Sequence, residues 1–384
     1  MLAGRYAIAG AAESDLGRTT GKSPLILQAE AARDAVKDAG ITFSKIDAVF
    51  AHVEDRFAPL QVAEYLGIRP RYVGSTNVGG MSNMCQVVHA MLAMESGLCT
   101  TALVTYGSTQ LSDASRRLGG PQDDARSPRG QFVTPYGQLT PLGFYAMAAM
   151  RHMHQYGTRP EHLAEVAVAA RKWAQLNPKA YRREPLTIEQ CLASPYLAEP
   201  LRQRDCCLVT DGGGALVVTS RERARDLART PVTIRGFASG FSHHFTPLEL
   251  EDWLDIGVSR GTAEALAMAG VERGELDFVQ IYDHFTIGVI QTLEEMGFCA
   301  RGEGGQFVGG GRIAPGGDFP LNTSGGGLSY NHPGMFGMLL MIEAVRQLRG
   351  ECGPRQVKDA RLGLVFGAAM VFSGYTVMVL ERDR

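Results

Sequence analysis

Two short segments of the chain carry side chains that can transfer protons. Residues 281–285 read Ile-Tyr-Asp-His-Phe, and a glycine-rich segment that begins at Ser324 contains Tyr330 and His332. A free tyrosine has a pKa of about 10 and therefore starts as a proton donor. Next to a histidine or a developing enolate it can donate a hydrogen bond or relay a proton. Tyr282, Tyr330 and His332 are therefore our candidate catalytic residues.

The neighbouring polar residues, and these three, also have structural interpretations. A buried tyrosine commonly satisfies one hydrogen bond and does nothing else, and His332 stands in a setting of glycines and a proline. His284 enters a helical segment, where we expect a structural role, and Asp283 is expected to be the N-cap of that helix. His243 and His244 have no carboxylate or cysteine at metal-ligand spacing, so we expect a surface or lid position and no metal site.

A second group of candidates consists of glycines. Glycine has no side chain, so the backbone can approach a bound ligand closely. The candidates for substrate binding are Gly79, Gly80, Gly325, Gly326, Gly327 and Gly367.

The composition limits the class of protein. The chain has 384 residues, of which 45% are hydrophobic and 20% charged. This length suggests two or three domains, and the composition is ordinary for a soluble globular protein. A formal net charge of −2 without basic clusters gives no electrostatic footprint for nucleic acid. No apolar run approaches the roughly 20 residues of a membrane helix. We expect neither nucleic acid nor a membrane as a partner.

The cysteines and the first residues indicate the compartment. The start of the chain lacks the basic-then-apolar pattern of a signal peptide, so we expect a cytoplasmic location. The seven cysteines are an odd number and are scattered along the chain. Cys206 and Cys207 form the only close pair, at a spacing too short for a metal or redox motif. We expect reduced thiols, most of them buried as small apolar side chains.

One pattern occurs twice. Gly40 and Gly270 each end an Ala-rich helical segment, because glycine tolerates the left-handed conformation of a helix cap. At the same spacing each is followed by an apolar run, 46–49 in one case and 276–279 in the other, as expected of a buried strand. Each half therefore contains a helix, a loop and a core strand in the same order, which predicts a βαβ-type unit used twice.

A long excursion separates the two halves. It opens with the polar, Gly- and Arg-rich stretch 116–131, which is typical of a surface loop. Two helical runs follow, 142–156 and 160–176, and the second has a proline in its first turn, where proline is favoured. Strands are expected at 214–219, closing the first half, and at 232–237, opening the second.

These elements predict an α/β protein of two similar halves with an insertion in the first. The expected boundaries are 1–110 plus 201–228 for the N-terminal half, 111–200 for the inserted, lid-like region and 229–384 for the C-terminal half.

Several ordered motifs resemble the thiolase superfamily, and in particular its sterol-carrier-protein thiolase branch, over nearly the whole chain. Residues 169–180 look like that branch's loop helix, and 200–215 resemble its return to the core. Residues 324–327, followed by His332-Pro333-Gly334, are similar to the superfamily's glycine-rich GHP active-site loop. Residues 281–285 stand where thiolases carry an Asn-Glu-Ala-Phe or His-Asp-Cys-Phe motif. The resemblance implies a thiolase fold, layered αβαβα.

The nucleophilic cysteine of a thiolase is missing. That cysteine lies at the N-terminus of a buried helix, where the helix dipole favours a thiolate. Counted back from Gly97, the position falls on Gly80 or Met81, and neither can attack a thioester. Cys85 lies about one turn further along, or about 5.4 Å, and would miss the pocket. We interpret Cys85 as core filler, beside Val88 and Leu92.

The second thiolase cysteine is missing too. It should fall near Phe366 and Gly367, in a stretch without cysteine. Covalent acyl transfer by the usual route is therefore not expected, although dead enzymes also lose such residues. Glycines at 79 and 80 would open the wall of the pocket, which suits a substrate bulkier than an acetyl group.

The combination resembles the steroid side-chain-cleaving aldolases, thiolase relatives without the nucleophile. The resemblance implies a retro-aldol cleavage of a β-hydroxyacyl-CoA to a ketone and a short acyl-CoA such as propionyl-CoA. It implies that Tyr282 and Tyr330 are the acid/base pair, in an order left open, and that His332 donates to the oxyanion. Coenzyme A enters as part of the substrate, and no permanently bound cofactor is expected.

The resemblance also implies two assemblies. One is a homodimer in which the first halves pack their sheets together, and the other is a complex with a small zinc-ribbon and OB-fold protein. Two other functions remain open. The chain could be an acyltransferase or Claisen-type condensing enzyme with an unexpected cysteine, or a non-catalytic scaffold that binds acyl-CoA.

Overall fold

The computed structural model describes residues 2–52, 57–115, 124–137, 141–243 and 252–383. Nine of its strands form one sheet in the order β3-β2-β4-β7-β1-β8-β11-β10-β9, and β5 pairs with β6 separately. The strands are β1 (Tyr6–Glu13), β2 (Ala48–His52), β3 (Tyr72–Gly74), β4 (Thr101–Ser108), β5 (Tyr196–Ala198), β6 (Leu201–Arg202), β7 (Gly212–Ser220), β8 (Val232–Phe241), β9 (Phe278–Ile281), β10 (Leu362–Ala368) and β11 (Gly374–Arg382).

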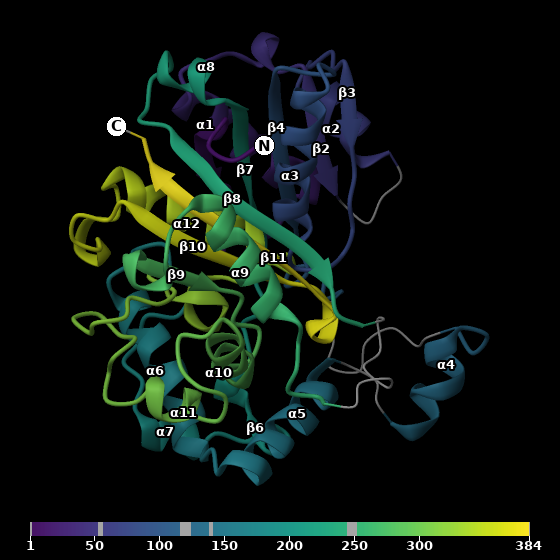
Figure 1. Ribbon diagram of the computed structural model, residues 1–384. Helices are drawn as coiled ribbons and strands as arrows, with labels where there is room; N and C mark the ends of the chain where they lie inside the picture. Colours follow the sequence, from purple (N-terminus) through teal and green to yellow (C-terminus); the bar gives the residue numbers. More distant parts are fainter. Residues whose placement is uncertain (1, 53–56, 116–123, 138–140, 244–251, 384) are drawn as a thin grey trace.

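The α-helices connect and cover these strands (Figure 1). They are α1 (Pro24–Asp38), α2 (Ala58–Tyr65), α3 (Ser82–Glu95), α4 (Pro128–Phe132), α5 (Pro141–Tyr156), α6 (Pro160–Gln175), α7 (Ile188–Leu192), α8 (Arg221–Arg225), α9 (Val258–Ala269), α10 (Thr286–Glu295), α11 (Gly304–Phe307) and α12 (Gly337–Arg349). No helix among the described residues is long and apolar enough to cross a membrane.

The repeated helix–loop–strand unit is confirmed. α1 begins at the N-cap Ser23 and is followed by Gly40 at φ 71°, whereas α9 ends at Gly270 at φ 67°. The strands that follow, β2 and β9, pair in parallel with β4 and β10, and these pair antiparallel with β7 and β11. The order β1-β7-β4-β2 in the first half is thus repeated as β8-β11-β10-β9 in the second.

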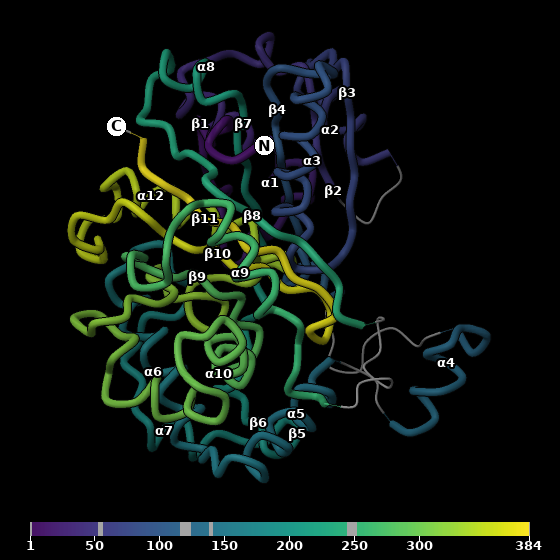
Figure 2. The backbone as a smooth tube through the Cα atoms, viewed as in Figure 1, coloured from purple at the N-terminus to yellow at the C-terminus, as the bar shows by residue number. Residues whose placement is uncertain are grey.

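The two halves share one continuous sheet, because β1 and β8 pair antiparallel through Ala7–Thr233 and Ile8–Val232. The tube drawing shows β8 and β11 running side by side across the middle of the molecule (Figure 2). Helices α3 and α12 pack against each other between the two halves, whereas α1 and α9 cover the outer faces. The arrangement is the αβαβα layering that the resemblance implied.

The inserted segment lies between β4 and β7. The two expected helical runs are confirmed as α5 and α6, and α6 has Pro160 at its first position. The stretch expected as a surface loop, 116–131, falls partly outside the described residues, and its described part ends in the short helix α4 rather than in a loop. The expected strands are confirmed as β7 and β8.

All seven cysteines are free thiols, and four of them are buried. Cys85 is one of the four, as expected, but its neighbours are different. It packs in a small cluster with Met81 and Ala369, whereas Leu92 is exposed. Burial raises the pKa of the Cys85 thiol, and its sulfur lies 3.3 Å from Oγ1 of Thr376. A thiol held in the protonated form is a poor nucleophile.

Candidate active site

Helices α3 and α12 begin close to each other, and Tyr282 lies beside their first residues. This tyrosine follows the last residue of β9, and Asn322 holds that strand end through two amide hydrogen bonds to the backbone of Ile281, of 2.7 and 2.9 Å. The Tyr282 hydroxyl donates to the Gly334 carbonyl at 2.6 Å and accepts from the Phe336 amide at 3.4 Å. Phe336 is the N-cap of α12, so this amide belongs to the positive end of the helix dipole.

His332 is the second member of this cluster. Its Nε2 atom lies 3.1 Å from the Tyr282 hydroxyl, and the two rings meet edge to face. The backbone of His332 is fixed by Thr210 Oγ1 at 2.9 Å and by the Gln110 side chain at 2.8 Å. The structure therefore brings Tyr282 and His332 into direct contact, whereas the predicted oxyanion-donor role of His332 stays a prediction.

Gly80 makes room for Tyr282. A Cβ atom built on Gly80 would lie 2.1 Å from Cε2 of the tyrosine ring and 2.6 Å from its hydroxyl oxygen. Gly80 comes just before α3, at a position counted from the sequence as that of the lost nucleophile. The expectation that Gly79 and Gly80 open the pocket wall is therefore wrong for Gly80, because the phenol ring fills the space that the glycine leaves.

Tyr330 lies apart from this pair. Among the described residues, no hydrogen bond or ring contact joins it to Tyr282 or His332, and none reaches its hydroxyl group. The ring is 3% exposed. Its pKa is raised well above 10, first by burial and then by the negative charge of Glu13, which outweighs the opposing charge of Arg346. Tyr330 is therefore held in the protonated form.

Glu13 is the centre of a buried ion network behind Tyr330. Lys179 lies 2.5 Å from Oε1 of Glu13, and Arg346 lies 2.8 Å from the same atom. Burial alone would raise the pKa of Glu13, but the two cations outweigh burial and lower the pKa to about 2. Glu13 is therefore a fixed negative charge at neutral pH.

Asp283 organises the loop that carries Tyr330. The expected N-cap role of Asp283 in α10 is wrong, because that N-cap is Phe285. Instead, its carboxylate accepts from the Gly327 amide at 2.7 Å and the Leu328 amide at 3.2 Å. These amides belong to the first turn of η6, a π-helical segment (Gly326–Tyr330). Asp283 therefore caps a helical turn that is distant in sequence, and so ties the Tyr282 segment to the Tyr330 loop.

The pH dependence of stability should report on Asp283. Burial raises its pKa from 3.8 to about 7. Between these values the folded protein keeps a proton that the unfolded chain has lost, so the stabilising contribution is complete below pH 4 and is lost as the pH rises to 7. Between pH 4 and 7, the free energy of unfolding of the parent protein should therefore fall relative to that of Asp283→Asn, by up to about 1.4 kcal/mol per pH unit.

Urea unfolding of the two proteins at pH 4, 5, 6 and 7 measures this difference. The asparagine variant is the matched reference, because every other titrating group is common to both proteins. A difference that stays constant over this range would show that Asp283 is ionised in the folded state throughout.

The other candidate glycines are packed against protein atoms. A Cβ on Gly326 would lie 2.0 Å from the Asp283 carboxylate, one on Gly325 would lie 2.6 Å from Cβ of Ala174, and one on Gly327 would lie 2.9 Å from the His332 ring. Gly325 and Gly326 also have φ values of 102° and 62°, which favour glycine. These contacts explain the glycines structurally, and their role in binding substrate stays a prediction.

Gly79 and Gly367 lie beside the start of α3. A Cβ on Gly367 would lie 2.6 Å from Sδ of Met84, and one on Gly79 would lie 3.2 Å from the Met370 amide. Both glycines therefore allow close packing between α3 and the end of β10. Their predicted contact with the substrate is not decided by this packing.

Sequence reasoning missed one aromatic side chain of the cluster, Tyr145 of α5. It is 2% exposed, and its ring centroid lies 4.3 Å from that of His284 and 4.6 Å from that of Phe285. His284 in turn donates from Nδ1 to the Tyr282 carbonyl, 3.1 Å away, which fits the expected structural role. The only sequence signal was a tyrosine on the apolar face of a helix, which is more often simply core.

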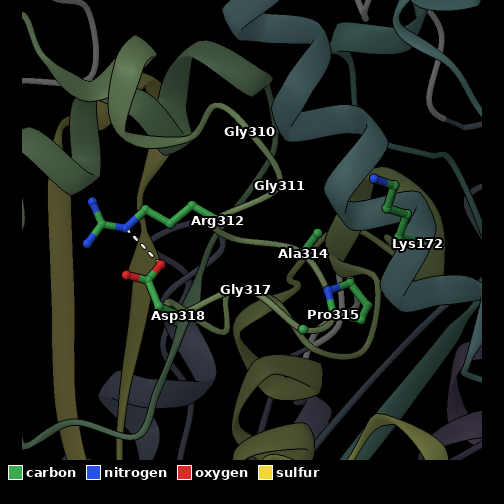
Figure 3. Close-up of a pocket in the computed structure, with 9 residues that line it drawn as sticks. Lys172, Gly310, Gly311, Arg312, Ala314, Pro315, Gly317 and Asp318 are labelled. Atoms are coloured by element: carbon green, nitrogen blue, oxygen red, sulfur yellow. Dashed lines mark hydrogen bonds and ion pairs between the residues drawn. The ribbon is translucent and has the colours of Figure 1, made fainter.

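A cavity lies away from this cluster. It has a volume of about 730 Å³ and lies between Lys172 of α6 and the glycine-rich loop 310–318 (Figure 3). The Arg312 side chain turns away from Lys172 in this view and pairs with Asp318 at 3.1 Å. None of the predicted catalytic or binding residues lines this cavity.

Comparison with known proteins decides the family. Residues 238–382 match the thiolase C-terminal domain-like family. The 17-hydroxy-3-oxo-4-pregnene-20-carboxyl-CoA lyase of Mycobacterium tuberculosis is 37% identical, over 91% of this chain and 93% of the lyase. The steroid side-chain-cleaving aldolase of Thermomonospora curvata is 36% identical over the whole of both chains. The chain belongs to the thiolase superfamily, in the family of these aldolases.

The solved structures support the same assignment for this thiolase-superfamily aldolase. The Ltp2–ChsH2(DUF35) aldolase superposes with a TM-score of 0.91 and 34% identity, covering 100% of this chain and 99% of that one. Human mitochondrial 3-ketoacyl-CoA thiolase shares the fold, with a TM-score of 0.74 at 15% identity and coverage of 100% and 99%. The thiolase fold is therefore confirmed.

Proposed function

We propose that the protein is a carbon–carbon lyase that cleaves a β-hydroxyacyl-CoA, derived from a steroid side chain, into a ketone and a short acyl-CoA such as propionyl-CoA. The contact of Tyr282 with Gly80 carries this proposal. It replaces a sulfur nucleophile by a phenol at the start of α3, without changing the surrounding fold. Retro-aldol cleavage needs proton transfer but no nucleophile, and the identity to a lyase and an aldolase supports this reaction.

Tyr282 would act as the base. Its hydroxyl proton, which is directed at the Gly334 carbonyl in the structure, turns to Nε2 of His332, 3.1 Å away. The phenol oxygen passes this proton to His332 as it takes the proton of the substrate's tertiary hydroxyl. The hydrogen bond from the Phe336 amide, together with the positive end of the α12 dipole, favours negative charge on the phenol oxygen during this relay. The electrons of the O–H bond then form the ketone carbonyl as the bond between the α- and β-carbons breaks.

Tyr330 would act as the acid. Breaking the bond leaves an enolate of the CoA thioester, and the proton that Tyr330 retains through burial is delivered to its α-carbon. The positive charge on His332 stabilises the enolate while it exists. A proton returned through solvent from His332 to Tyr330 restores both groups, so the sum is one substrate giving one ketone and one acyl-CoA. Coenzyme A takes part only as the carrier of the acyl group.

The reaction can be tested directly with the complex. We expect the chain, co-expressed with a small zinc-ribbon and OB-fold protein, to convert a 17-hydroxylated steroid-CoA to a 17-ketosteroid and propionyl-CoA. Mass spectrometry of both products measures this cleavage. Formation of a new carbon–carbon bond, or transfer of the acyl group to free coenzyme A, would assign the protein to the acyltransferases instead.

Thiol alkylation separates the aldolase from a cysteine-dependent acyltransferase. We expect iodoacetamide to leave at least half of the cleavage activity, because Cys85 is buried and held as a thiol. Cys207 needs a control, since its amide donates to the His284 carbonyl at 2.9 Å and the side chain is partly exposed. The Cys207→Ser variant removes any steric block that alkylation there causes. Loss of activity in this variant on alkylation would argue for a catalytic cysteine.

A partner and a second copy are part of the proposal. The solved Ltp2–ChsH2(DUF35) aldolase is named as an assembly of two proteins, which supports a small partner here. For a homodimer, the support is the edge strand β3, whose outer side has no neighbour in the sheet among the described residues. Exposed Val73 lies on β3, and Leu60 and Tyr65 lie on the adjacent α2. An open strand edge beside apolar side chains is a common site of pairing.

The proposed dimer predicts a change in mass on substitution at this edge. Val73→Glu combined with Leu60→Glu should shift the protein from a dimer to a monomer in analytical ultracentrifugation. Leu98→Glu, at another exposed apolar position, is the matched control and should leave the mass unchanged. A monomeric parent protein would contradict the dimer.

We further propose that the protein lies in the cytoplasm, because seven free thiols suit a reducing compartment. Cell fractionation tests this location.

A further inference from the structure

A strained turn lies beside the Tyr282 segment. Val371 and Phe372 have φ values of 48° and 59°, in the left-handed region that suits glycine. For a β-branched residue this conformation is an outlier, and it persists only where surrounding contacts hold it. The turn joins β10 to β11, and its first residues, Ala369 and Met370, pack on Gly79 at the start of α3.

Tyr145 reaches this turn from the inserted region. Its hydroxyl oxygen accepts a hydrogen bond from the Phe372 amide at 3.2 Å, and its ring meets the Phe372 ring edge to face at 4.6 Å. Two residues that follow β8 also hold the turn. A ring nitrogen of His243 lies 3.0 Å from the Val371 carbonyl oxygen, and Ser242 donates to the Phe372 carbonyl at 3.1 Å.

Tyr145 also contacts the catalytic segment. Its ring packs against His284, whose other ring contacts include Phe372 at 5.6 Å and Tyr282 at 5.4 Å. One buried phenol therefore touches the strained turn through its oxygen and the Tyr282–His284 segment through its ring. Both contacts would be lost if α5 shifted.

We propose that Tyr145 is a positioning residue that holds the Val371–Phe372 turn and the His284 ring in register, and so fixes Tyr282 between Gly80 and His332. The inference rests on the proposed lyase function and adds a specific role for the inserted region. The hydroxyl group acts on the backbone of the turn, whereas the ring supports His284. Removing the oxygen alone should therefore loosen the turn while the aromatic packing stays.

Tyr145→Phe tests this role, because it deletes only the hydroxyl group. We expect kcat for steroid-CoA cleavage to fall about 10- to 100-fold, because a small displacement of a catalytic group is costly, with KM within about threefold of the parent value. Hydrogen–deuterium exchange at residues 369–375 should become faster, while exchange in α5 is unchanged. Tyr156→Phe makes the same substitution at the end of the same helix and should alter neither readout.

A second substitution separates positioning from direct chemistry. Glycine adopts the φ of Val371 without strain, so Tyr145→Phe/Val371→Gly should slow exchange in the turn again and recover most of kcat. A low kcat that Val371→Gly does not restore, or unchanged exchange in Tyr145→Phe, would overturn the inference. Exchange does not depend on turnover, so a parent protein without lyase activity would refute the proposed function and still leave this inference to be judged by the exchange data.

Discussion

Replacing Tyr330 by phenylalanine should reduce kcat/KM for steroid-CoA cleavage by about 10²- to 10⁴-fold, the usual contribution of a positioned general acid. This corresponds to about 3–5 kcal/mol of transition-state stabilisation. The structural reason is that the Tyr330 hydroxyl has no hydrogen-bond partner among the described residues, while burial and Glu13 keep its proton in place. Tyr330 therefore enters the reaction as a phenol, the form that a general acid requires.

Stability measurements make this test specific. Since the hydroxyl makes no hydrogen bond to a described residue, Tyr330→Phe should change the free energy of unfolding by less than about 1 kcal/mol. Tyr136→Phe, at a tyrosine that is 83% exposed, is the matched control and should alter neither activity nor stability. Full activity in Tyr330→Phe would remove Tyr330 from the mechanism and leave the acid to be found elsewhere.

Gly80→Ala should abolish at least 99% of the activity and lower the free energy of unfolding by about 2–3 kcal/mol, as overpacking of a filled core does. The added Cβ would lie 2.1 Å from the Tyr282 ring, so the ring must leave its place between α3 and His332. Equilibrium unfolding in urea measures the stability loss, and product release from the steroid-CoA measures the activity loss.

A double-mutant cycle identifies Tyr282 as the cause. In a Tyr282→Ala background, Gly80→Ala meets no ring, so its effect on stability should be close to zero and the coupling energy should be about 2–3 kcal/mol. Gly274→Ala is the matched control, because a Cβ there has no neighbour within 4 Å, and it should cost less than about 0.5 kcal/mol. Additive effects of Gly80→Ala and Tyr282→Ala would mean that the two residues do not touch.

Much of the fold follows from local patterns in the chain. The Ala-rich helices that end at Gly40 and Gly270, and the apolar runs after them, were enough to predict the repeated unit. The helices α5 and α6 were also predicted to within one residue at each end. These features depend on apolar periodicity, on proline at a helix start and on glycine at a helix end, all of which act over a few residues.

The candidate site could be predicted only in part. The residue types were visible in the sequence, and Tyr282 and His332 do lie together. Tyr282 and Tyr330 were expected to act as an acid/base pair, and this stays a prediction. Asp283 was expected to be the N-cap of α10, the helix next in sequence, whereas its carboxylate accepts from a backbone amide of η6. Sequence reasoning could not find this partner, because it lies far away along the chain.

The sequence by itself determined the α/β class, the duplication, the family and the loss of both thiolase cysteines, because each of these is a matter of residue identity and short-range spacing. Only the tertiary structure decided that the Tyr282 ring occupies the space beside Gly80, and that Tyr145 of the inserted region reaches the Phe372 amide. These contacts join segments that are far apart along the chain, and close packing of distant segments leaves no periodic signal in the chain.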